Sequence, residues 1–68
     1  MNTIIVQITA AQAERNRVAA AVINRHHEIA EWVSGLDDPW LAEFMTHEER
    51  SRWRALGIAV EEMQRHLP

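Results

Sequence analysis

The pattern of apolar and polar positions changes along the chain and predicts four elements. Residues 3–8 are rich in β-branched side chains, and every second one is apolar, which is typical of a short β-strand. Apolar residues then recur at helical spacing in 10–33, 39–45 and 47–66, which predicts a long helix, a short helical turn and a second long helix. We therefore expect one domain over residues 1–68, mainly α, built as an antiparallel helical hairpin with an N-terminal strand.

Local signals set the expected boundaries of these helices. Capping boxes, in which a threonine precedes a Gln or Glu by three positions, occur at 9–12 and 46–49 and indicate two helix starts. Gly35 is a plausible left-handed stop for the first helix. An acidic pair precedes Pro39, which suits the first position of the short helical turn.

The two long helices differ in the width of their apolar faces. The second has a narrow seam with 3-4-3-4 spacing, which fits one antiparallel neighbour; its members are Trp53, Leu56, Val60, Met63 and Leu67. The first has a wider arc that includes Ala11, Val18, Val22, Ile29, Trp32 and Val33. Because this arc is too wide for one helix, we expect it to contact both the hairpin partner and a second copy of the chain.

A lone strand also favours a homodimer, because its backbone groups need a partner strand. The expected assembly joins two copies through an intermolecular two-stranded ribbon. A chain of 68 residues without cysteine would gain stability from such association. The alternative is an extended arm packed on the helices. The residues expected at the dimer contact are Ile4, Val6, Ile8, Val18 and Val22.

Composition narrows the class of function. Ten acidic residues against seven arginines give a net charge of −3, which disfavours nucleic acid as a partner. No apolar run is long enough for a membrane span and the N-terminus is unlike a signal peptide, so we expect a cytoplasmic protein. No nucleophile motif or phosphate-binding loop occurs, and we expect neither enzymatic activity nor a cofactor. We interpret the histidines as ordinary surface residues, not metal ligands: His26, His27, His47 and His66. His26 falls on the apolar arc, so the alternative for it is a core or interface position.

Two groups of residues are candidates for partner binding. Trp40 and Phe44 either close the open end of the hairpin or form an exposed aromatic anchor. Arg50, Arg54 and Ile58 form one row on the last helix, which could contact an acidic partner surface or be a solvated face.

Arg15 is unusual because it falls inside the apolar arc of the first helix. It could extend its charged end to solvent, or pair with an acidic residue across an interface. Gly57 lowers helix propensity in the last helix and could permit a close approach between helices.

The order strand, helix, helix in a dimer is also that of ribbon-helix-helix repressors, which insert a paired strand into the DNA major groove. In that case Thr3, Ile5 and Gln7 would face the DNA. Gln7 could contact an adenine, but the expected strand has no arginine and the net charge is negative. DNA binding is therefore the alternative hypothesis.

The stretches ITAAQAERNRVAAAVINRHHEIAEWV and DPWLAEFMTHEERSRWRALG resemble small early proteins of Mu-like phages of pseudomonads. That group includes anti-activators of quorum-sensing regulators, inhibitors of a pilus-assembly ATPase and anti-CRISPR proteins. The resemblance implies a stoichiometric inhibitor or adaptor that blocks a host protein, such as a quorum-sensing transcription activator kept off its DNA. An acidic surface would compete for a basic DNA-binding face. The acids available are Glu28, Glu31, Asp37, Asp38 and Glu43.

Overall fold

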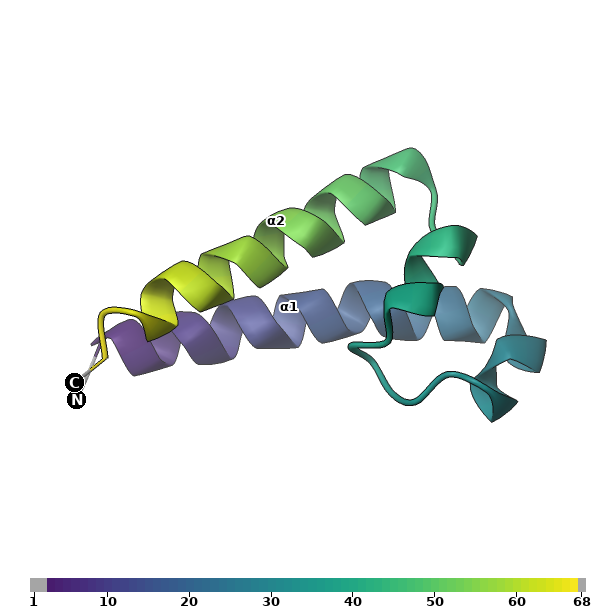
Figure 1. Ribbon diagram of the computed structural model, residues 1–68, viewed down its shortest axis with the longest axis horizontal. Helices are drawn as coiled ribbons and strands as arrows, with labels where there is room; N and C mark the ends of the chain where they lie inside the picture. Colours follow the sequence, from purple (N-terminus) through teal and green to yellow (C-terminus); the bar gives the residue numbers. More distant parts are fainter. Residues whose placement is uncertain (1–2, 68) are drawn as a thin grey trace.

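The computed structural model describes residues 3–67, which form a helical hairpin (Figure 1). Helices α1 (Thr3–Arg25) and α2 (His47–Gln64) run antiparallel, and two 3-10 helices, η1 (His27–Glu31) and η2 (Pro39–Phe44), lie in the connection. The long helices are close together where α1 begins and α2 ends. They diverge at the other end, where η2 lies between them (Figure 1). The mainly helical hairpin predicted from the sequence is confirmed.

The N-terminal strand is a wrong prediction, and so is the extended arm. Residues 3–8 form the first turns of α1, where the backbone carbonyls accept hydrogen bonds from within the helix and no partner strand is needed. Ile4 and Ile8 are half-buried, while Val6 is 48 % exposed, as expected for positions on opposite sides of a helix. The predicted capping box at 9–12 is inside α1, where the Thr9 hydroxyl donates to the Ile5 carbonyl at 2.9 Å.

The end of the first helix also differs from the expectation. Helix α1 ends at Arg25 instead of continuing to residue 33, because His26 leaves the helical region with φ −130° and ψ 69°. The chain then forms η1, which places Ile29 in the core with no exposed surface. In a straight helix Ile29 would lie beyond the end of the core. The break at His26 turns the chain back, so that Ile29 packs beside Ala19 and Val22 of α1.

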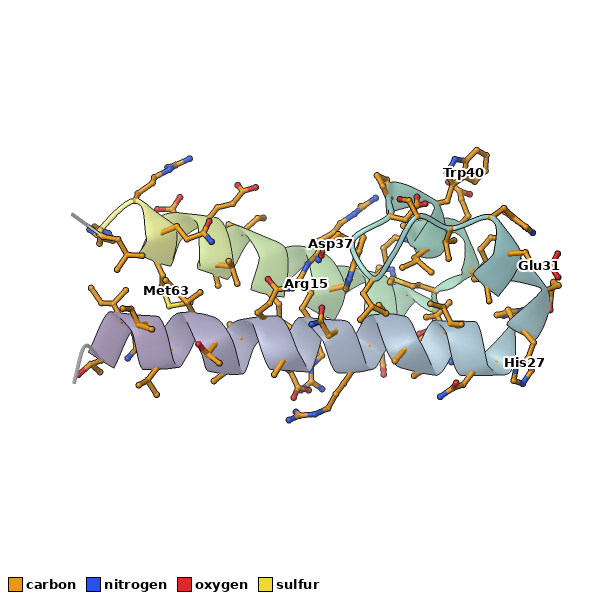
Figure 2. The ribbon with its side chains drawn as sticks, turned by 90° about the horizontal axis from the view of Figure 1, so that it is seen from below. Arg15, His27, Glu31, Asp37, Trp40 and Met63 are labelled. Atoms are coloured by element: carbon orange, nitrogen blue, oxygen red, sulfur yellow. The ribbon has the colours of Figure 1, made fainter. Side chains whose placement is uncertain are left out.

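The core lies at the wide end of the hairpin and draws on every element. It contains Ala19 and Val22 of α1, Ile29 of η1, Leu41 of η2, Met45, and Trp53 of α2. Towards the other end the helices pack more simply, with Val60 buried and Met63 between the two helices (Figure 2). Most of the apolar stabilisation therefore depends on the connecting segment being held against α1 and α2.

Because residues 3–8 are helical, they cannot form the two-stranded ribbon expected between copies, and the core covers part of the expected dimer contact. Val22 has no exposed surface within one chain, and Val18 packs against the same core. Of the residues expected at a dimer contact, Val6 is the most exposed.

No helix among residues 3–67 combines the length and hydropathy that crossing a membrane requires.

Helix α2 begins as the sequence predicts and is tied to the end of α1. Thr46 is its N-cap, and the capping box with Glu49 is complete, with bonds of 2.9 and 3.2 Å. Glu49 also accepts two hydrogen bonds from Arg25, at 2.6 and 3.0 Å. Arg25, followed by the Thr46 backbone N–H, lowers the pKa of Glu49 from 4.5 to about 2. One carboxylate thus caps α2 and joins it to α1.

Glu49→Gln is expected to lower the free energy of unfolding at pH 7 by about 1 kcal/mol or less, because the ion pair is partly exposed. In the unfolded chain Glu49 takes up its proton near 4.5, but in the folded protein near 2. Its stabilising contribution is therefore complete above pH 4.5 and is lost as the pH falls towards 2. Urea titrations across this window should give a flatter pH dependence for the variant than for the wild type. Glu48→Gln is the control, and equal pH dependence for E49Q and E48Q would contradict the assignment.

Candidate functional site

Four aromatic rings gather at the wide end of the hairpin. The Trp32 ring lies 5.7 Å from Phe44 at 69°, and 6.5 Å from Trp40 at 79°, both edge-to-face contacts. His26 lies 5.5 Å from Phe44 on the α1 side. Phe44 is half-buried against the core, whereas Trp32 is 54 % exposed and Trp40 is 61 % exposed. Edge-to-face packing therefore holds two indoles in fixed positions while leaving much of their surface open to a partner.

Asp38 fixes the position of Trp40. Its carboxylate accepts from the Trp40 backbone N–H at 2.9 Å, and from the Ser34 N–H and hydroxyl at 2.7 and 3.1 Å. The bond from the Ser34 N–H, and next that from Trp40, lower the pKa of Asp38 below its usual value. The carboxylate is buried, caps η2 and ties the loop to it. From this anchored backbone the Trp40 side chain points away from the body of the molecule (Figure 2).

The segment that carries these indoles is strongly acidic. Residues 26–46 contain five acids and no arginine, a charge of −5; since the whole chain carries −3, the remainder carries +2. Two of the acids serve the fold, because Asp38 is the cap described above and Asp37 pairs with Arg15. Glu31 and Glu43 are exposed and form no ion pair with any residue of 3–67.

We call Trp32, Trp40, Glu31 and Glu43 the aromatic–acidic surface. Glu31 precedes Trp32 in the chain, and Trp40, Glu43 and Pro39 line a shallow hollow of about 210 Å³. Indole faces and carboxylates both attract cations. The chemistry available at this surface is therefore the recognition of positively charged groups.

The arginine row predicted on α2 does not act as one unit. Arg50 donates to the Ala42 carbonyl at 3.0 Å and the Met45 carbonyl at 3.4 Å. It thus satisfies acceptors at the C-terminal end of η2 and is a structural side chain. Arg54 and Ile58 are exposed, and the Ile58 side chain is 61 % exposed.

Arg15 pairs with an acidic residue of its own chain. Its guanidinium lies over the Trp53 ring, with Cζ 4.1 Å from the ring centroid, and Nη1 bonds to Asp37 of the loop. Figure 2 shows Arg15 and Asp37 pointing toward each other. The Arg15 side chain, and not the backbone of α1, lies closest to Gly57. A Cβ atom at Gly57 would be 3.2 Å from Arg15 Nε. Arg15, Arg54 and Ile58 therefore come together around one hollow on the side of the hairpin.

The structure adds Trp32 to the residues that the sequence singled out. The apolar pattern predicts Trp32 in the wide arc of a long helix, but the break at His26 turns Trp32 outward beside Trp40. The signal for this role was its position in a stretch with acids and no arginine. Within residues 3–67, no three His, Cys, Asp or Glu side chains are grouped so that they could hold a metal ion.

Comparison with protein-family models, curated proteins and solved structures finds no match to this chain. The resemblance to early proteins of Mu-like phages therefore stays a prediction.

Proposed function

We propose that this chain is a small inhibitor or adaptor that binds a basic surface of a host protein through its aromatic–acidic surface. The observation that carries the proposal is the pair of half-exposed indoles, Trp32 and Trp40, held edge to face in a segment with five acids and no arginine. A partner of this kind is the DNA-binding face of a transcription activator, which the phage resemblance also implies. Binding would block the activator stoichiometrically in the bacterial cytoplasm.

The physics of interfaces supports this assignment. Tryptophan is enriched among the residues that dominate binding energy, most of all where neighbours exclude water around it. Arginine and lysine side chains can contact an indole face and a carboxylate at once, and Trp40 and Glu43 line the same hollow. The charge of −5 on residues 26–46 would also speed the approach of a basic partner and select against acidic ones.

The ribbon-helix-helix hypothesis loses its premise, because Thr3, Ile5 and Gln7 lie in α1 and form no strand. An anti-CRISPR role belongs to the same class of stoichiometric blockers and differs only in its target. The homodimer predicted from the sequence also belongs to this proposal, without the ribbon. Sedimentation of the free chain and of the complex would measure both assemblies.

The test is an affinity capture from lysate of the natural host after nuclease treatment, followed by affinity measurement with the purified target. Trp40→Ala should weaken binding by about 30-fold or more, as expected for a central hot-spot residue. Ile5→Ala changes a similarly exposed apolar residue near the start of α1, outside the expected dimer contact, and should leave affinity unchanged. The captured protein should present a basic surface.

Three outcomes would contradict the proposal. Equal affinity of W40A and I5A for the target would show that the aromatic–acidic surface does not bind it. A target that binds through an acidic face would show that charge attraction does not select the partner. Capture that vanishes with nuclease would transfer the assignment to nucleic acid.

A further inference from the structure

The hollow beside Trp40 owes its geometry to the 3-10 helix η2. In a 3-10 helix, side chains three positions apart lie directly above one another, one turn of about 6 Å apart. Trp40 and Glu43 have this spacing, and together with Pro39 they line the hollow of about 210 Å³. In an α-helix the same two side chains would be offset by about 60° around the axis. Helix η2 therefore aligns a carboxylate with an indole ring on one edge of the connecting segment.

The Trp40 ring is held in place, but its side towards the hollow is open. The Asp38 carboxylate accepts from the Trp40 backbone N–H at 2.9 Å, and Trp32 contacts the ring edge to face with the centroids 6.5 Å apart. Trp32 does not line the hollow, and Trp40 remains 61 % exposed. Of the residues that the structure describes, Pro39 and Glu43 line the hollow with Trp40, so an incoming planar cation meets no other ring or cation there.

Glu43 keeps its charge available to a partner. Its carboxylate is exposed and forms no ion pair with any residue of 3–67. Two arginines approach the C-terminal end of η2, but Arg25 pairs with Glu49, and Arg50 donates to backbone carbonyls. The fold therefore leaves a free carboxylate next to an exposed indole.

We propose that the occupant of this hollow is an arginine side chain of the partner, and not a lysine. This inference rests on the proposed function, because it names the residue that the basic surface of the partner contributes. The guanidinium stacks on the Trp40 ring, and its edge donates to the Glu43 carboxylate. The aliphatic stem of the arginine packs on Pro39.

The shallow shape of the hollow decides between the two cations. Water reaches an ammonium group there from most sides, so a lysine keeps its hydration and gains little from the indole or the carboxylate. A guanidinium is planar and more weakly hydrated, and one of its faces can lie on the indole while its edge pairs with a carboxylate. Selectivity thus comes from shape and hydration, since both cations carry the same charge.

Two short peptides test this selectivity on the free protein. One alternates arginine with serine, and the other alternates lysine with serine at equal length and charge. At low ionic strength the arginine peptide should bind about fivefold or more tightly, because only its side chains can stack and pair at once. Binding should shift the ¹H–¹⁵N NMR signal of the Trp40 indole N–H, which is assigned by its absence from the Trp40→Leu variant.

Matched variants separate the hollow from the general charge of the segment. Trp40→Leu keeps an apolar side chain without a ring, and Glu43→Gln removes the carboxylate; each should lower the arginine-to-lysine ratio to about twofold or less. Glu28→Gln is the same charge change in the same acidic segment outside the hollow, and should weaken both peptides alike. All three side chains are exposed, so these variants should fold.

The inference is overturned if the wild type prefers arginine by less than about twofold, or if E43Q and E28Q give equal ratios. The proposed function has a separate test, because it is measured with the captured target. If W40A weakens target binding but the peptides show no preference, only the arginine inference fails. If the peptides show the preference but W40A binds the target as the wild type does, the proposed function fails, although the hollow selects arginine.

Discussion

Leu41→Ala is expected to leave little folded protein at 25 °C. Leu41 has no exposed surface and packs in the core that joins η2 to α1 and α2. Truncation of a buried leucine costs about 2–5 kcal/mol, including the cavity that it leaves. Since a core in a chain of this size contributes only about 3–5 kcal/mol in total, one substitution removes most of the stability. Urea titration followed by circular dichroism at 222 nm would measure the loss.

Leu36→Ala provides the matched control for this prediction. It is the same chemical change in the same connecting segment, but the Leu36 side chain is 37 % exposed. Its cost should be well below that of L41A and within about 1 kcal/mol, because partly exposed residues lose less packing. Comparable losses for the two variants, or a loss below about 1 kcal/mol for L41A, would show that η2 is not part of the core.

The elements that local chemistry determines were predictable from the sequence. Helix α2 begins at His47, immediately after Thr46, because the capping box needs only residues three positions apart. Asp38 and Pro39 likewise specify the start of η2 within two residues. In both places the signal and the structure that it determines lie within one turn of each other, so no knowledge of the fold is required.

Helix α1 could not be predicted as well, because tertiary packing decides both of its ends. The β-branched run at 3–8 favours a strand locally, but this preference is weak and context-dependent, and the run continues into an alanine-rich helix packed on α2. The break at His26 has no glycine or proline to announce it. It exists because Ile29 reaches the core only if the chain turns there, and that requires knowing where the core is.

In the candidate site, too, the sequence predicts some of the residues that take part but not the role that tertiary packing gives each of them. The sequence left Trp40 and Phe44 as either a plug for the hairpin or an exposed anchor, and the structure gives each a different part: Phe44 packs on the core and Trp40 faces outward. The residue pattern predicts Arg50 as a partner-binding residue, because nothing in the sequence shows that the carbonyls of Ala42 and Met45 accept from it. Roles that depend on backbone groups brought close by folding are hidden from residue patterns.

Asp38→Ala is expected to release Trp40 from its fixed position and to destabilise the fold. The substitution removes the acceptor for three hydrogen bonds, two of them from backbone N–H groups of Ser34 and Trp40. The ratio of folded to unfolded protein should fall about tenfold or more, since a lost cap is combined with donors left unpaired. The affinity for the target should fall further than stability alone explains, because the two indoles are no longer held edge to face. Urea titration and target binding by the folded fraction would measure these effects separately.

Two neighbouring substitutions make this prediction specific. Asp37→Asn changes the adjacent aspartate, whose side chain is 76 % exposed and pairs with the largely buried Arg15. Because an amide oxygen can still accept from Arg15 and no backbone donor loses its acceptor, D37N should cost less stability than D38A. Asp38→Asn should be intermediate, because an amide has one oxygen where the carboxylate uses two. The pKa of Asp38 is lowered in the folded protein, so its stabilising contribution is present above the ordinary aspartate pKa and is lost as the pH falls through the lowered value. D38N should lack this acid-dependent loss, and D37N should retain it. If D38A instead bound the target as tightly as the wild type, the orientation of Trp40 would not matter for binding, and the proposed aromatic–acidic surface would be wrong.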